Sequence, residues 1–389
     1  MCMSGFIRVL AFSLALLLLL PFSNALAKPL EEICPLTLTA PAALLMEANT
    51  GTVIFEKNAM EKRPAASITK LMTLLLAFEA LEDGTITLDT PVTMSQTAAR
   101  QTGSQAFLDA GATYRMEDLL KATIIASAND AAVAIAEYLA GGESNFAEKM
   151  NEKAQTLSLH NSHFVNCTGL PAENQYTCAA DVAVIARELC RHPQYFQYSS
   201  IWMDTLTHPS GRVTDLTNTN RLVRFYNGCD GFKTGSTNEA KYCLCATAEK
   251  GGMRLIAVVL GVPNSQTRFD EARAMMDWGF ASYTREEICR PGDLTGQRVP
   301  VKLGSRDTVD AALGSGLSML LKTGQKKGLS FETELPDTLT APVKKGQEIG
   351  TVRILLDGTV IAALPAVAAE AVPLPGMLDG ITRLWENWK

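Results

Sequence analysis

The chain has 389 residues, of which 47% are hydrophobic and 20% charged, and these proportions are typical of a globular protein rather than a disordered or fibrous one. Its 35 Lys and Arg residues against 41 Asp and Glu residues give a net charge of −6, and no long basic run interrupts this balance. The electrostatic footprint of a nucleic-acid-binding protein is therefore missing, and we expect neither DNA nor RNA as a partner. At about 150 residues per domain, the length indicates two or three domains.

Residues 1–27 have the pattern of a secretory signal peptide. Arg8 provides a short positive segment, residues 9–20 are almost entirely apolar, and Ala25 and Ala27 supply the small side chains that signal peptidase recognises. The apolar stretch is short for a membrane span, and an uncleaved anchor is the alternative interpretation. We therefore expect an exported, extracytoplasmic protein.

Nine cysteines are present, and removal of residues 1–27 leaves eight of them. Export permits disulfides, but eight cysteines in a chain of this size do not require them, and their spacing does not give a connectivity. Cys243 and Cys245 lie on one face of a predicted strand, yet a metal site needs further ligands at short spacing. We interpret both as small buried residues, and we expect neither a metal nor another cofactor.

Hydrophobic patterning predicts a first domain with strands at both ends and helices between them. Residues 44–47 and 52–56 flank a Gly-containing turn and indicate an antiparallel hairpin, and a second hairpin is predicted at 242–248 and 254–260. Between the hairpins, helical spacing of apolar residues predicts helices over 65–82, 117–140 and 144–159. The fold class is therefore α+β, with one sheet built from both ends of the domain and a helical region inserted.

A second, smaller domain is predicted to follow. A helix over 270–283 ends the first domain, which would span 38–283, and the polar segment 284–292 has the composition of a linker. From 293 to 366, short β-rich runs alternate with turns that contain Gly, Pro and Asp, and this pattern predicts a small all-β domain. Residues 367–389 combine an Ala- and Pro-rich extended segment with a terminal helix.

The terminal helix has an amphipathic pattern. After Pro375 and Gly376, apolar side chains recur on one helical face, namely Met377, Leu378, Ile381, Leu384, Trp385 and Trp388. A helix of this length cannot span a bilayer, which needs about 20 residues, but it can lie in the interface with its Trp rings at headgroup depth. Docking on the all-β domain is the alternative, because the polar face has no net positive charge. We predict peripheral attachment to the outer face of the cytoplasmic membrane.

The motif Ser67-Ile68-Thr69-Lys70 lies at the start of the helix predicted over 65–82. Residues three apart on a helix lie on one face, so Ser67 and Lys70 would be neighbours. A serine hydroxyl is a poor nucleophile until a base takes its proton, and a lysine kept neutral can be that base. The alternative is an exposed Ser and Lys on the first turn of a helix, because so short a pattern also arises by chance.

The motif Ser127-Ala128-Asn129 lies within the helical stretch predicted over 117–140. A hydroxyl and a carboxamide that project into a cleft could relay a proton and hold a peptide amide. Helix capping is the alternative role for these side chains. A second copy of the same short pattern begins at Ser236.

The motif Lys233-Thr234-Gly235 runs toward the second hairpin. It would place a cation, a hydroxyl and a bare backbone on a strand against which a substrate could lie. A second copy begins at Lys322, beside a polar Gly- and Lys-containing segment of the all-β domain. We assign that copy to a solvated turn.

These three motifs occur in order on a helix, a helical segment and a strand, and a closely related set characterises class A β-lactamases and penicillin-binding proteins. From about residue 38 to 389, the chain resembles the low-molecular-mass penicillin-binding proteins that are D-alanyl-D-alanine carboxypeptidases. The resemblance is carried by these motifs together with segments 64–70, 164–170 and 230–235. The resemblance implies an antiparallel sheet with helices on both sides and a helical subdomain, followed by a small all-β C-terminal domain.

The resemblance also implies catalytic roles. Ser67 would attack the carbonyl between two terminal D-alanines of a peptidoglycan stem peptide and form an acyl-enzyme. Lys70 would be its general base, and Ser127 would pass the proton to the leaving D-alanine. β-Lactam antibiotics would be covalent inhibitors that acylate the same serine.

Substrate-binding roles are implied for Asn129, Lys233, Thr234, Gly235, Ser236 and Arg254. Asn129 would hold Lys70 and the substrate amide, and Lys233 would supply positive potential that favours a neutral Lys70. Thr234 would bind the terminal carboxylate, with Arg254 as a helper on the paired strand. Backbone N–H groups of Ser67 and Ser236 would form the oxyanion hole. The family often has His or Tyr at position 236, so the side-chain contacts there differ in this chain.

Three other functions remain open from the sequence. A D,D-endopeptidase that cuts peptidoglycan cross-links would use the same catalytic groups. A β-lactamase would need a carboxylate for fast deacylation, and Glu173-Asn174 does not lie in the E-x-x-L-N pattern of those enzymes. A catalytically silent envelope-binding protein would keep the fold but would not be labelled by a fluorescent penicillin.

Overall fold

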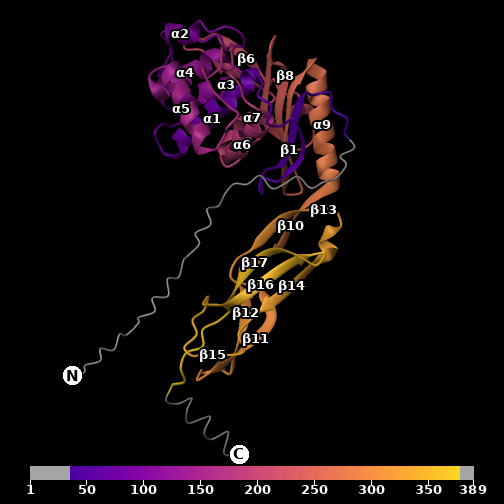
Figure 1. Ribbon diagram of the computed structural model, residues 1–389. Coiled ribbons are helices and arrows are strands. Elements are labelled where there is room, and N and C mark those ends of the chain that lie inside the picture. Colours follow the sequence, from indigo (N-terminus) through magenta and orange to yellow (C-terminus); the bar gives the residue numbers. More distant parts are fainter. Residues whose placement is uncertain (1–35, 377–389) are drawn as a thin grey trace, which may run out of the picture.

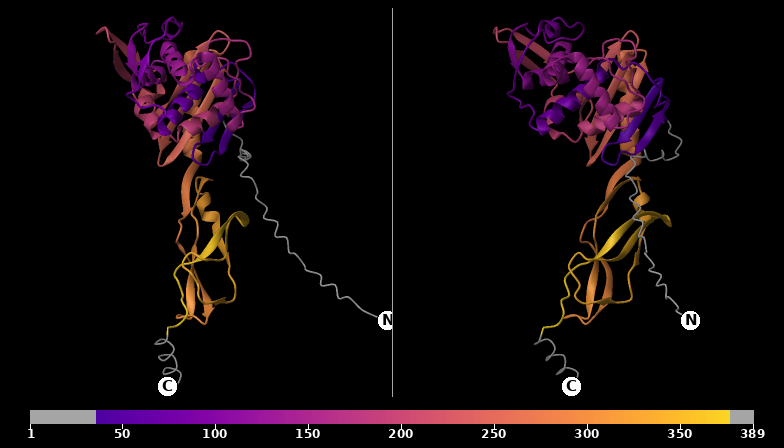
Figure 2. Two further views of the ribbon diagram at one scale, coloured as in Figure 1. Left: turned by 90° about the vertical axis from the view of Figure 1, so that its left-hand side faces the viewer. Right: turned by 60° about the vertical axis from the view of Figure 1, so that its left-hand side comes forward.

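The computed structural model describes residues 36–376, which form a larger domain of helices and strands and a smaller domain of strands (Figure 1). The smaller domain extends away from the larger one in every view, so the molecule is elongated (Figure 2). The predicted signal peptide at 1–27 and the apolar face of the predicted terminal helix, from 377 onward, lie outside the described residues.

A five-stranded antiparallel sheet forms the centre of the larger domain, in the order β2-β1-β9-β8-β7. Its strands are β1 (Ala42–Glu47), β2 (Val53–Lys57), β7 (Cys229–Thr237), β8 (Lys241–Lys250) and β9 (Met253–Val262). Pairing of β1 with β9 joins the two ends of the domain, so both predicted hairpins and the sheet built from both ends are confirmed. Strand β7 lies at the edge, which leaves one side of its backbone available for a partner.

Helices cover both faces of this sheet. Along β9, Ile256 and Val258 pack on the helical region, whereas Leu255 and Val259 pack under α9 (Ser265–Ser282). Successive side chains of a strand point to opposite faces, so two covered faces require an apolar residue at almost every position. This explains the long apolar run of β9. Figure 1 shows the sheet between the helical region and α9.

The helical region lies between β2 and β7. It comprises the 3₁₀ turn η1 (Ala66–Thr69), α1 (Lys70–Glu82), α2 (Gln96–Ala99), α3 (Met116–Ile125), α4 (Asn129–Ala140), α5 (Glu143–Thr156), α6 (Ala179–Leu189), α7 (Pro193–Ser199) and α8 (Leu222–Phe225). Two small hairpins complete it, formed by β3 (Pro91–Thr93) with β4 (Thr113–Arg115) and by β5 (Met203–Thr207) with β6 (Val213–Thr217).

The single helix predicted over 117–140 is wrong, because the chain forms two helices, α3 and α4, with a break between them. Ser127 lies in the break with a φ of +63°, a left-handed conformation that a continuing α-helix does not allow. Both helices bury their apolar sides in the same core, so the helical periodicity continues across the break. The sequence pattern therefore did not reveal it.

The smaller domain contains a six-stranded sheet in the order β14-β16-β17-β12-β11-β15, which confirms the predicted all-β domain. Its strands are β11 (Leu294–Lys302), β12 (Thr308–Leu313), β14 (Leu329–Glu334), β15 (Leu339–Thr340), β16 (Glu348–Leu356) and β17 (Thr359–Ala368), with the 3₁₀ turn η2 (Gln325–Gly328). The segment after residue 366 is also part of this domain, because β17 continues to Ala368 and the fully buried Val372 pairs with Val343.

The segment 284–292 differs from the predicted linker because most of it lies in strand β10 (Tyr283–Cys289). This strand pairs with β13 (Leu317–Lys322) in a separate two-stranded sheet. Tyr283 and Leu320 are buried in the same apolar cluster as the residues under α9. Paired backbone and shared apolar packing therefore connect the two domains.

A buried carboxylate fixes the chain beside the break between α3 and α4. Asp130 is fully buried, and its carboxylate accepts backbone hydrogen bonds from Ala106 N at 3.0 Å, from Leu108 N at 3.1 Å and from Ala131 N at 2.9 Å. A buried carboxylate needs such donors because burial removes its water. The segment before β4 is thereby held against the start of α4.

We expect Asp130→Ala to lower the free energy of unfolding by about 2 kcal/mol, because three backbone N–H groups lose their acceptor. Urea denaturation at pH 7 measures this change. Glu148→Ala, at an exposed position of α5, is the matched control and should stay within about 0.5 kcal/mol of the unmodified protein. Equal losses in the two variants would contradict a structural role for Asp130.

Candidate active site

Ser67 and Lys70 lie at the junction of η1 and α1, and Lys70 Nζ is 3.0 Å from Ser67 Oγ. The neighbouring arrangement predicted from the motif is therefore confirmed. Ala66, directly before the serine, has a φ of +49°, which is uncommon for a residue with a side chain. Such backbone strain often occurs at functional sites.

Lys70 is fully buried, and two oxygens accept hydrogen bonds from its amine. Asn129 Oδ1 lies 2.6 Å and the Thr168 carbonyl oxygen 2.8 Å from Lys70 Nζ. A neutral amine has two N–H bonds and one lone pair, so with both N–H bonds donated the lone pair faces the Ser67 hydroxyl. In this state Lys70 can accept the serine proton.

Burial is the main reason that the pKa of Lys70 is lowered, from its ordinary 10.5 to about 7. The negative charge of the buried Asp130 carboxylate acts in the opposite direction and limits the decrease. A pKa near 7 leaves a large neutral fraction at neutral pH, as a general base requires.

The loop at 166–170 supplies one of these oxygens and lies tightly against α1. Thr73 Oγ1 donates to the Cys167 carbonyl at 2.7 Å. Gly169 has a φ of +82°, and a Cβ there would lie only 1.9 Å from the Ala66 carbonyl oxygen. The sequence analysis did not predict the contact of Lys70 with this loop, because every residue has a backbone carbonyl and the residue type therefore does not indicate which one accepts the hydrogen bond.

Asn129 is held on both sides at the start of α4. Its Nδ2 donates to the Thr102 carbonyl at 2.5 Å, and its backbone N–H donates to the Ser104 carbonyl at 2.7 Å. The Asn129 carboxamide forms hydrogen bonds with Lys70 and with a neighbouring loop, so it does not cap the helix. Ser127 lies buried in the break two residues earlier.

Strand β7 passes directly beside Ser67. A Cβ on Gly235 would lie 2.5 Å from the Ala65 carbonyl oxygen and 3.1 Å from Ser67 N. Only glycine allows this approach, because any larger residue would push the strand away from η1. Thr234 is buried on one side of this glycine, and Ser236 is exposed on the other.

Lys233 is fully buried, and within residues 36–376 its Nζ has no hydrogen-bond partner. Burial lowers the pKa of Lys233 well below its ordinary value, and the positive charges of Lys70 and Arg268 lower it further. A buried amine without a partner costs free energy unless a ligand satisfies it. An anionic group of a ligand could do so.

Arg268 is a further cation beside β7 that the sequence analysis missed. From α9, its Nη1 donates to the carbonyl oxygens of Gly235 at 3.2 Å and Cys243 at 3.4 Å. A single arginine in a helical pattern belongs to no motif. Only the packing of α9 on the sheet shows that it reaches the strand that carries Lys233.

Arg254 does not belong to this group, and the predicted helper role is wrong. Strand β9 does not pair with β7, because β8 lies between them. The Arg254 guanidinium donates to both Asp230 oxygens, at 2.7 and 2.8 Å, and to Glu249 Oε2 at 2.7 Å. Its positive charge is thus neutralised within the sheet.

The remaining sequence predictions concern residues away from the site. Lys322 ends strand β13 beside the all-β domain, so the second copy of the strand motif is not part of this cluster. Cys243 and Cys245 are fully buried, as predicted, and the seven cysteines in the described part of the chain are free thiols. Within that part, no group of three or more metal-ligating side chains occurs.

Two family models match the chain. The D-alanyl-D-alanine carboxypeptidase (peptidase S11) model matches residues 28–264, and the model of the penicillin-binding protein 5 C-terminal domain matches residues 283–374. The first match alone covers more than half of the chain. The chain belongs to the D-alanyl-D-alanine carboxypeptidase family. It is therefore a hydrolase of the peptidase class.

Curated relatives and solved structures agree with this assignment. The chain is 39% identical over 350 residues to the D-alanyl-D-alanine carboxypeptidase DacF of Bacillus subtilis, covering 90% of each chain. It is 36% identical to DacC of Escherichia coli over 89% of this chain and 87% of that protein. Penicillin-binding protein 5 of Haemophilus influenzae has the same fold, with a TM-score of 0.74 and 32% identity over 88% of this chain and 100% of that one.

We expect acylation of this enzyme by penicillin to become about ten-fold faster between pH 6 and pH 8, because the neutral fraction of a base with a pKa near 7 rises by that factor. Rates of labelling by a fluorescent penicillin, measured at constant ionic strength, test this expectation. Circular dichroism at each pH confirms that the fold is unchanged. A flat profile over this range would contradict the role of neutral Lys70.

Proposed function

We propose that this family member removes the terminal D-alanine from peptidoglycan pentapeptide stems through an acyl-enzyme on Ser67. The observation that carries the proposal is the buried Lys70 amine, whose pKa is about 7 and whose two N–H bonds are taken by Asn129 and Thr168. Its lone pair is left to receive the proton of Ser67.

In the acylation step, Ser67 Oγ would bond to the carbonyl carbon between the two D-alanines, and its proton would pass to Lys70. Backbone N–H groups of Ser67 and Ser236 would stabilise the oxyanion, a contribution of about 10²-fold or more in rate for each donor. The close approach of Gly235 to Ser67 N supports this placement. Ser127 would then pass a proton to the leaving D-alanine, and water would release the shortened peptide.

The free carboxylate of the substrate would lie by Lys233, Thr234 and Arg268. The buried Lys233 amine without a partner in the described structure supports this assignment, because a carboxylate would satisfy it. Arg268 adds positive charge from α9 through its contact with the Gly235 carbonyl.

β-Lactam antibiotics would acylate Ser67 as covalent inhibitors. They combine a strained amide with a nearby carboxylate, so the same groups would position them. Penicillin-binding protein D2 of Listeria monocytogenes, solved in an ampicillin-bound form, has 31% identity and a TM-score of 0.57 over 64% of this chain and all of that one. This likeness supports the proposal.

We expect Ser67→Ala to abolish both D-alanine release from a pentapeptide and covalent penicillin labelling, because the acylated oxygen is removed. The matched control is Ser236→Ala, which loses a hydroxyl but keeps the backbone N–H, and labelling should persist. Purified protein is assayed for D-alanine release, cross-link cleavage and β-lactam hydrolysis. Labelling of the Ser67 variant would place the nucleophile elsewhere, and dominant cross-link cleavage would favour the endopeptidase.

We also propose that the enzyme is exported and attached to the outer face of the cytoplasmic membrane through its terminal helix. The pattern of residues 1–27 and the apolar face from Met377 to Trp388 support this proposal. The helices of residues 36–376 include none that is long and apolar enough to cross a bilayer.

We expect deletion of residues 376–389 to release the mature protein from membranes while D-alanine release is retained. Sedimentation with membrane vesicles and an activity assay on the same sample test this outcome. Asp379→Ala, which changes the polar face only, should leave attachment unchanged. Continued sedimentation of the truncated protein, or joint loss of stability and activity, would show that the segment packs on protein instead.

A further inference from the structure

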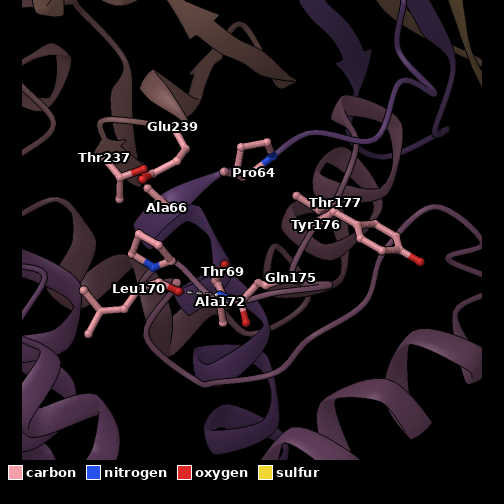
Figure 3. A pocket seen from close by; sticks show the side chains of 13 residues that line it. Pro64, Ala66, Thr69, Leu170, Ala172, Gln175, Tyr176, Thr177, Thr237 and Glu239 are labelled. Carbon is pink, nitrogen blue, oxygen red and sulfur yellow. Dashed lines mark hydrogen bonds between the residues drawn. The ribbon is translucent and has the colours of Figure 1, made fainter.

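A cavity of about 270 Å³ opens next to the nucleophile (Figure 3). It is lined by residues 64–66, which directly precede Ser67, by residues of the loop at 169–177, and by Thr237 and Glu239 at the end of β7. Except for the backbone near Ser67, the proposed reaction assigns no role to this lining.

The direction of the substrate along β7 determines what would enter the cavity. The carboxylate would lie near Lys233, and the scissile carbonyl would lie between Ser67 and Ser236. An extended peptide advances about 3.3 Å per residue along an edge strand. The residues that precede the scissile bond would therefore continue past Ser236 toward Thr237 and Glu239, into the cavity. This step rests on the proposed function.

The cavity has an apolar wall and a single charged residue. Pro64, Leu170 and Ala172 contribute apolar surface (Figure 3), whereas Glu239 is the only ionisable acid or base of the lining apart from a tyrosine. The Glu239 side chain is exposed and, among the described residues, has no hydrogen bond or ion pair. Lys62 is not among the lining residues, although its Nζ lies over the ring of the lining residue Tyr176, at 4.6 Å from the ring centroid.

The loop that forms one wall is held in place by Gln175. Its Oε1 accepts hydrogen bonds from Val165 N and Asn166 N, both at 2.9 Å, and its Nε2 donates to Asn166 Oδ1 at 3.1 Å. On the opposite side, Ala240 N donates to Thr237 Oγ1 at 3.0 Å and fixes the turn that carries Glu239. A cavity with fixed walls can select among substrates because little reorganisation is needed.

We propose that this cavity binds the stem-peptide residue that precedes the D-alanine pair, and that Glu239 selects a side chain with a free amine. The aliphatic part of such a side chain would lie on the apolar wall, and its ammonium group would pair with the Glu239 carboxylate. A stem whose amine is already acylated in a cross-link carries no charge there and loses this pairing. The enzyme then prefers stems that are not yet cross-linked through that amine.

Two peptides that differ only in one acetyl group test the proposal. Nα-acetyl-L-Lys-D-Ala-D-Ala keeps its ε-amine, and the Nα,Nε-diacetyl peptide does not. We expect the full-length enzyme to show a kcat/KM about three- to five-fold higher for the free amine, as for a partly exposed ion pair. In Glu239→Gln the preference should disappear while the rate on the diacetyl peptide stays unchanged. High salt should reduce the preference.

Glu173→Gln is the matched control, because Glu173 is an exposed acid of the same loop that does not line the cavity. Glu173→Gln should keep the preference for the free amine. Loss of this preference in both variants would indicate a general charge effect and would overturn the proposed subsite. The proposed subsite would also be overturned if the unmodified enzyme released D-alanine from both peptides at equal rates, or if the preference survived in Glu239→Gln. In either case the proposed D-alanine release itself would still be supported. Absence of D-alanine release from either peptide by protein that penicillin labels would overturn the proposed function as well.

Discussion

The arrangement of the site depends on the burial of one amine, that of Lys70. Lys70 is removed from water, which favours its neutral form, and two N–H bonds must then find acceptors inside the protein. Three separate segments meet around it, namely the start of α1, Asn129 at the start of α4, and the loop at 166–170. Packing of the helical region on the sheet is what keeps them together.

The need to bring these segments together around Lys70 explains where the backbone has positive φ angles and close approaches. Ala66 and Ser127 both have positive φ; Ala66 directly precedes Ser67, and Ser127 lies two residues before Asn129. Gly169 and Gly235 bring backbone against η1 at distances that a Cβ would not allow. The site therefore lies at the start of α1, at the break before α4 and on strand β7, where a glycine allows the close approach.

Side-chain patterns predicted much of this molecule. Alternation and turn residues gave the two hairpins and the all-β domain, and three short motifs marked residues that the fold brings into one region. What the sequence concealed depends on backbone and topology. The break at Ser127 lies inside a continuous apolar periodicity, and the acceptor at Thr168 is a carbonyl. The prediction for Arg254 was wrong because the strand order, with β8 between β9 and β7, is not written in local sequence.

Two features of the smaller domain are relevant to function: its packed junction with the larger domain and its elongated shape. Strand pairing between β10 and β13 and the burial of Tyr283 and Leu320 beneath α9 give the junction a packed interior rather than a flexible tether. The final described residues lie at the far end of this domain, away from the helical region (Figure 1). If the terminal helix attaches there to a membrane, the active site would be held at a distance set by the length of the domain. Attachment at the distal end would thus be compatible with access to peptidoglycan that lies away from the bilayer.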